Sequence, residues 1–372
     1  MRYEIISGNY ETYMDGDSRR IIDLSGGFGY QVPQVIDAVA LQAQQMGLSN
    51  RVLMSEPLIR LCRKLAEILP DPLVSSYVCN SGDEAFEGAL KLCKGLHPRR
   101  NTIVYIKGGD YGSLTYGRCL NQPQEYEEVQ RFLGFRSIAI GSLEDLNNVD
   151  WRDCFAVCHA NIGIGTDGNQ RLISHDLIDF LYSLAAREHI PVIGVDVQSC
   201  LGSLGTLFGF QQYSHVPSIV VLGGALGGGA LPIGTYTCSE NIAYKVYGRS
   251  SPAKHGSTTA GNPMACVAAI AALDHVISID APVRCEENGR ILGDVLEDFD
   301  LRVHGGWVGM SLDEKCDVLL LQKELYSRGV YVNVPTGREL ILRIPITARS
   351  EQIARAATAI KETYSHVLNH AA

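Results

Sequence analysis

Two periodicities of apolar residues run along the chain, one typical of amphipathic helices and one of buried strands. Apolar residues recur at i, i+3, i+4 and i+7 in VIDAVALQAQQM and EPLIRLCRKLAEIL, which predicts helices there. Short continuous apolar runs that are bounded by glycine or proline predict strands covered on both faces. The predicted strands are SYVC, TIVYIK, SIAIG, CFAVCHA, PVIGVDV, SIVVLG and PIGTYTC.

The predicted strands alternate with helical segments, among them EAFEGALKLCK and DLIDFLYSLAAREH. This order of strand, loop and helix favours an α/β fold with a mostly parallel, doubly wound sheet over residues 45–275. Beyond residue 275, strands and helices mix without that order. We therefore expect residues 276–372 to form a smaller α+β domain together with residues 1–44.

The charge and composition exclude several classes of partner. A net charge of −9 without a basic cluster argues against a nucleic acid or an anionic membrane. No apolar run approaches the roughly 20 residues that span a bilayer. The N-terminal segment also lacks the charged and apolar regions of a signal peptide, so we expect a cytoplasmic protein.

Cysteine and histidine usage argues against cross-links and metal sites. The 11 cysteines are scattered through apolar surroundings without a CxxC pair, which predicts reduced core cysteines rather than a disulfide framework. The 10 histidines are likewise dispersed, and no paired carboxylates have the spacing of metal ligands on a helix. We expect no metal.

Candidate binding residues lie where predicted strands end. Ser81, Gly82 and Asp83 stand at a strand-to-helix junction, where free backbone N–H groups and small side chains let a phosphate come close, although the same residues suit a plain helix cap. Asp196 ends an apolar strand and needs a partner, because a buried unpaired carboxylate is costly. His159 ends another strand and has a pKa suited to proton transfer, although a lone histidine is more often structural.

Five motifs, in the order SGDEA, GGDYGS, VDVQ, LGGALGGGALPIG and HGSTTAGNP, resemble those of class III aminotransferases. The resemblance covers roughly residues 8–360. It implies the architecture of fold type I enzymes, which use pyridoxal phosphate, with the sheet in a large domain and both chain ends in a smaller one. It also implies an amine or amino-acid substrate.

The resemblance implies a role for each matched residue. Ser81, Gly82 and the Asp83 amide would hold the cofactor phosphate. Asp196 would pair with the pyridine nitrogen, and Gln198 would contact the 3-hydroxyl of the ring.

Two further matches concern a second subunit and the substrate. Thr258 would cap the phosphate in a neighbouring subunit, which implies a homodimer. Arg343 would hold a substrate carboxylate through its bidentate guanidinium.

The chain also departs from the family pattern. Gly224 stands where the family has the lysine that holds the cofactor as a Schiff base. Asp110 stands where an aromatic ring stacks on the pyridine, and a shift of one residue would let Tyr111 stack instead. His159 and Val197 each replace a glutamate. Because several positions differ together, we interpret Gly224 as the natural residue.

Glycine can neither form the Schiff base nor carry a proton, so a standard transaminase is not expected. The first interpretation is noncovalent binding of pyridoxal or pyridoxamine phosphate, with altered chemistry on an amine-bearing small metabolite. The candidate proton carriers are His159, Lys254, His255 and Tyr111. Two alternatives stay open: an inactive subunit that pairs with an active relative, and a scaffold that uses the crevice for another ligand.

Overall fold

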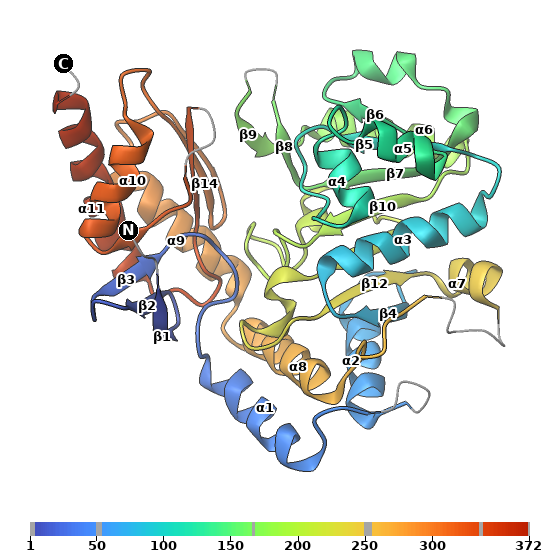
Figure 1. Ribbon diagram of the computed structural model, residues 1–372, viewed down its shortest axis with the longest axis horizontal. Coiled ribbons are helices and arrows are strands. Elements are labelled where there is room, and N and C mark those ends of the chain that lie inside the picture. The colour runs from blue at the N-terminus through green and yellow to red at the C-terminus, as the bar shows by residue number, and fades with distance from the viewer. Residues whose placement is uncertain (1–3, 50–53, 166–167, 249–254, 335–337, 371–372) are drawn as a thin grey trace.

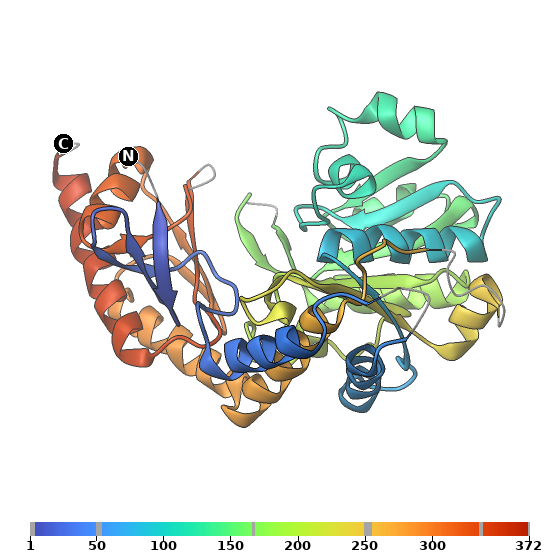
Figure 2. The same cartoon turned by 60° about the horizontal axis from the view of Figure 1, so that its bottom comes forward.

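The structure is a computed structural model that describes residues 4–49, 54–165, 168–248, 255–334 and 338–370. Its ribbon has a large α/β part and a smaller part, and both chain ends lie in the smaller part (Figure 1). Turning the molecule shows the same two parts, connected along one side by α1 and α8 (Figure 2).

A seven-stranded sheet forms the centre of the large part. Its strands, in spatial order, are β4 (Ser75–Cys79), β12 (Gly234–Cys238), β11 (Ile219–Leu222), β10 (Val192–Asp196), β7 (Cys154–Ala160), β5 (Thr102–Ile106) and β6 (Arg136–Ile140). Only β12 runs antiparallel to its neighbours. The predicted mostly parallel α/β sheet is confirmed.

Apolar side chains of this sheet alternate between two covered faces, as the continuous apolar runs predict. In β11, Ile219 and Val221 pack in the cluster under α3, whereas Val220 and Leu222 pack toward α8. One face carries α3 (Gly82–Leu96), α4 (Thr115–Asn121), α5 (Glu127–Leu133) and α7 (Glu240–Tyr247). The other carries α6 (His175–Arg187), α8 (Pro263–Ser278), α2 (Glu56–Ile68) and α1 (Pro33–Gln45).

The smaller part combines segments from both chain ends. One sheet contains β1 (Ile5–Asn9), β2 (Thr12–Asp15), β3 (Arg20–Asp23) and β15 (Val330–Tyr331). A second contains β13 (Leu301–His304), β14 (Trp307–Ser311) and β16 (Glu339–Arg343). The helices are α9 (Ala281–Val295), α10 (Val318–Ser327) and α11 (Ser350–His370). The pairing of β3 with β15 joins the two ends of the chain. The proposed boundaries at residues 45 and 275 stay a prediction, and α1 packs on α8 of the large part.

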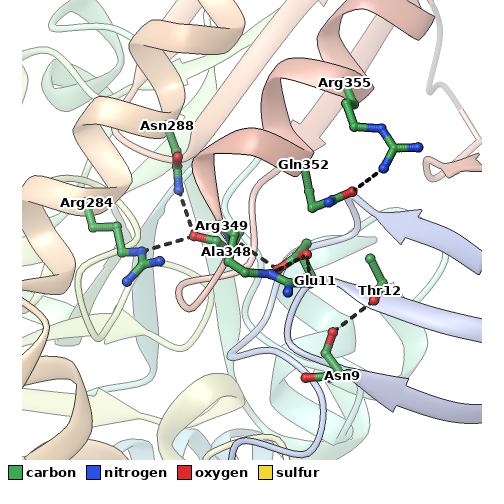
Figure 3. Close-up of polar contacts among 9 residues, drawn as sticks. All are labelled: Asn9, Glu11, Thr12, Arg284, Asn288, Ala348, Arg349, Gln352 and Arg355. Atoms are coloured by element: carbon green, nitrogen blue, oxygen red, sulfur yellow. Dashed lines mark hydrogen bonds and ion pairs between the residues drawn. The ribbon is translucent and has the colours of Figure 1, made fainter.

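An ion pair between a buried carboxylate and a partly exposed arginine connects the N-terminal strands to the start of α11 (Figure 3). The Glu11 carboxylate is fully buried and accepts hydrogen bonds from Arg349 Nη2 at 2.7 Å and Nε at 3.1 Å. The neighbouring carbonyl of Ala348 accepts from Arg284 Nε at 3.0 Å and Asn288 Nδ2 at 3.2 Å, both on α9. Three chain segments are therefore held together at one point.

The cysteines and helices agree with a globular interior. All 11 cysteines are free, and all except Cys62 are buried. No single helix in the described ranges is long and apolar enough to cross a membrane. The pair α8 and α9 passes that test only when joined, and it bends by 66° at the break.

Candidate functional site

A cavity of about 270 Å³ opens between the two parts, at the carboxyl ends of the parallel strands. The large part contributes Gln198 and Gly224 to its wall, and the smaller part contributes Trp307 and Arg343. A second cavity of about 190 Å³ shares Ile162, Gln198 and Ser199 with the first, so the two adjoin. A third, of only about 20 Å³, lies at the N-terminus of α3.

Arg343 supplies positive charge to the 270 Å³ cavity. Its guanidinium makes no hydrogen bond or ion pair with any residue that the structure describes. Burial lowers its pKa, and the carboxylates of Asp110 and Asp23 oppose that effect. An arginine stays charged at any ordinary pH, so this cavity presents a cation that lacks a close partner.

Gly224 begins a short 3₁₀ helix, Gly224–Gly227, and lines the same cavity. Its φ of +54° is in the left-handed region, where a side chain is strained. A Cβ atom there would lie 2.4 Å from the carbonyl oxygen of Val197. The backbone would have to shift to accept a lysine at this position. No lysine lines any of the three cavities in the described part of the chain.

The start of α3 is capped and packed by the chain itself. Ser81 Oγ accepts a hydrogen bond from the Glu84 amide at 3.1 Å, as a helix cap does. A Cβ on Gly82 would lie 2.8 Å from a methyl group of Val197, so only glycine allows this close approach. The carboxylate of Asp83 accepts from the Ser113 amide at 2.8 Å. A negative charge therefore already stands at this helix N-terminus.

Asp110 lines two of the cavities, whereas Tyr111 lines only the smallest one. Its Oδ1 accepts from the Gly112 amide at 3.0 Å and from Asn121 Nδ2 at 3.2 Å, and its Oδ2 accepts from Gln198 Nε2. This last bond connects the loop after β5 to the loop after β10. The 20 Å³ cavity beside it has room for about one water molecule.

The Asp196 side chain lies on the opposite face of its strand from Val195 and Val197. Successive side chains of a strand point to opposite faces, and Val195 and Val197 line the small cavity. Asp196 lines none of the three cavities. Its oxygens accept from Asn161 Nδ2 at 3.1 Å, from Ser199 Oγ and from the Gly209 amide at 2.6 Å. Burial raises its pKa to about 6, and these three donors oppose that rise.

The contacts of Asp196 do not favour its predicted role as partner of a pyridine nitrogen, and that role stays a prediction. Its carboxylate is enclosed by the chain's own donors on the face away from α3. Side chains alternate between the two faces of a strand. When both faces are covered by apolar residues, the sequence does not show whether the odd-numbered or the even-numbered side chains face the crevice.

Two of the candidate proton carriers, His159 and Tyr111, are buried, and a third, His255, lines none of the three cavities. His159 is buried on the α6 face, with its Nε2 2.9 Å from Tyr182 Oη, and burial lowers its pKa to about 4. Tyr111 is buried, and its hydroxyl donates to the Ile106 carbonyl at 2.8 Å. His255 packs edge-on against Tyr236 and lines none of the three cavities.

The burial and contacts of His159 and of the Tyr111 hydroxyl do not favour proton transfer in the crevice, and the predicted roles of His159, Tyr111 and His255 stay predictions. The fourth candidate, Lys254, lies outside the described residues. Thr258 is exposed, and its predicted contact with a second subunit stays a prediction. Sequence reasoning missed Trp307 and Asn161, which carry no motif and reach the crevice only through the fold.

The family model of class III aminotransferases matches residues 4–136 and 163–364. The chain belongs to this family. It is 25% identical to the acetylornithine aminotransferase of Methanocaldococcus jannaschii, over 98% of this chain and 94% of that protein. It is 28% identical to ornithine aminotransferase 2 of Staphylococcus aureus (strain MRSA252), over 85% of this chain and 84% of that protein.

Solved structures show the same fold. A transaminase from the marine bacterium Virgibacillus has a TM-score of 0.90 at 16% identity, covering 100% of this chain and 94% of that one. The ornithine aminotransferase of Toxoplasma gondii has a TM-score of 0.87 at 21% identity, covering 100% and 92%. That structure records pyridoxal phosphate at partial occupancy in its active site.

Class III aminotransferases depend on pyridoxal phosphate, but the crevice of this family member does not fit it. The space at the start of α3 holds about one water molecule, and a phosphate there would meet the like charge of Asp83. Val195 faces the small cavity, so its wall offers no carboxylate at that position to a ring nitrogen. Gly224 offers no amine.

Proposed function

We propose that this aminotransferase relative does not transaminate, and that it binds a small carboxylate-bearing metabolite between its two parts without pyridoxal phosphate. The observation that carries the proposal is the unpartnered guanidinium of Arg343 in the wall of a 270 Å³ cavity. A buried charge is costly unless it is paired, and a carboxylate pairs with arginine through two parallel hydrogen bonds. Trp307 and Ile344 add apolar surface for the rest of such a ligand.

Two other interpretations, noncovalent binding of the cofactor and an inactive partner subunit, require changes at these residues or a second protein. Noncovalent use of pyridoxal or pyridoxamine phosphate requires the Asp110–Gln198 bond to break and the Asp83 carboxylate to leave the helix end. An inactive subunit beside an active relative requires a partner that completes its site through Thr258. No contact among the described residues favours either one over ligand binding at Arg343. A homodimer is compatible with the exposed Thr258.

Tryptophan fluorescence can test the proposal directly, because one of the two tryptophans lines the cavity. A Trp151→Phe background leaves Trp307 as the only tryptophan, which can be excited selectively. We expect small carboxylates to change its emission in a saturable manner. Arg343→Gln should weaken binding about 10- to 100-fold, the range for a hydrogen bond to a charged group. Arg355→Gln, which removes an exposed arginine on α11, should leave binding unchanged.

The cofactor is tested on the same samples. Protein incubated with pyridoxal phosphate and then desalted should retain no cofactor absorbance. Stoichiometric retention of the cofactor, or carboxylate binding that survives Arg343→Gln at full strength, would overturn the proposal.

A further inference from the structure

The 190 Å³ cavity beside the Arg343 cavity has an acceptor-rich wall. Asp110, Asn161, Gln170 and Gln198 line it, and no lysine or arginine does so among the described residues. Since the two cavities share Ile162, Gln198 and Ser199, one small ligand can extend from one into the other.

Asp110 gives this second cavity its negative charge. Amide N–H groups solvate its two oxygens, but it forms no ion pair with any residue in the described ranges. Its charge does reach Arg343, because it raises the pKa of that guanidinium against the effect of burial. The joined cavities therefore have a cation at one end and an anion at the other, each without an ionic partner in contact.

Asn161 adds an acceptor that lacks a donor. Its Nδ2 donates to Asp196 at 3.1 Å and to Ser199 at 2.7 Å. The reverse orientation of the amide would point its oxygen at the Asp196 carboxylate, while the Ser199 hydroxyl already donates to Asp196, so this orientation is fixed. Oδ1 of Asn161 is buried and has no hydrogen-bond donor in the described part of the chain. A buried acceptor of this kind is rare without a partner.

We propose that the second cavity is an ammonium-binding site formed by Asp110 and Asn161. The ligand of the crevice is then a zwitterion, with its carboxylate on Arg343 and its ammonium group beside Asp110. This inference rests on the proposed function. It adds a recognition site at the position where the motif comparison placed an aromatic ring, and it needs no chemistry on the amine.

Pairs of ligands that differ only at the amine test the proposal, with the Trp307 emission of the Trp151→Phe protein as the readout. We use alanine against lactate, and 5-aminovalerate against 5-hydroxyvalerate, so that both a short and a long separation of the charges are sampled. At least one amine should bind more tightly than its hydroxyl analogue. Asp110→Asn should weaken the binding of that amine about fivefold, which is the size of a contact with an exposed carboxylate. The affinity for the hydroxyl analogue should not change.

Asp83→Asn is the matched control, because Asp83 lines only the small cavity at α3 and should affect neither member of a pair. If amine and hydroxyl analogues bind alike and Asp110→Asn changes neither, the ammonium site is refuted while the proposed function stands. If no carboxylate binds at all, the proposed function itself fails. If Arg343→Gln weakens binding of both members and Asp110→Asn weakens binding of the amine alone, the proposed function and the ammonium site both stand.

Discussion

Replacing Gly224 by alanine tests whether the backbone at this position can accept a side chain. In Gly224→Ala the new Cβ would meet the Val197 carbonyl oxygen at 2.4 Å, with φ at +54°. The left-handed conformation costs about 1–2 kcal/mol for a residue with a side chain. Forcing an extra carbon into a packed site adds about 1–3 kcal/mol. We expect a loss of about 2–5 kcal/mol in the free energy of unfolding, measured in urea.

A second glycine separates the two contributions. Gly134 also has a positive φ, +70°, but a Cβ there would meet nothing within 4 Å. Gly134→Ala should therefore lose only the conformational part, about 1–2 kcal/mol. If Gly224→Ala lowers the free energy of unfolding no more than Gly134→Ala does, a steric clash with Val197 is refuted. Gly224→Lys should also fail to develop the absorbance of a lysine-bound cofactor, and a stable variant that develops it would refute the reasoning.

Two other predictions concern stability. Glu11→Ala should cost about 2–3 kcal/mol in urea, because the buried carboxylate holds Arg349 through several hydrogen bonds. Asp298→Ala, which breaks an exposed pair with Lys361, should cost less than about 1 kcal/mol, and equal losses would contradict this. Burial lowers the pKa of His159 from 6.5 to about 4, so its stabilising contribution is present above pH 6.5 and is lost as pH falls toward 4. The urea midpoint of His159→Gln should fall less than that of the wild type between about pH 7 and 4.5, and parallel curves would contradict the burial argument.

The strands of the sheet could be predicted because each one is marked by a run of apolar residues within its own short segment. All seven apolar runs identified as strands are strands of the central sheet. Strands β5, β7, β10, β11 and β12 are buried at every position, as strands covered on both faces are, whereas the edge strands β4 and β6 are only partly buried. The antiparallel direction of β12 did not follow from the pattern, because strand direction depends on the connection between elements and not on the residues of the strand.

The site was less predictable, since it depends on which way side chains point. In VDVQ the residue types suggest Asp196 as the functional group, but the register turns it away and brings Val195 and Val197 to the crevice. A shift of one position reverses the face of every side chain in a strand. His159 likewise points to the α6 side, whereas Arg343, to which the family resemblance gives a substrate carboxylate, lines the 270 Å³ cavity, and its predicted role stays a prediction.

The departures from the family pattern depend on one another, which explains why restoring one residue is not expected to restore a cofactor site. Gly82 and Gly224 both approach Val197 more closely than a side chain would allow. Val197 is thus held against the start of α3, where the cavity shrinks to about 20 Å³. Next to it, Gln198 is bonded to Asp110 and closes the other side. A lysine at position 224 would meet the Val197 carbonyl at its Cβ atom, and the space at the start of α3 holds about one water molecule, whereas the cavity at Arg343 stays open. Binding should therefore be sought on the open side, at Arg343.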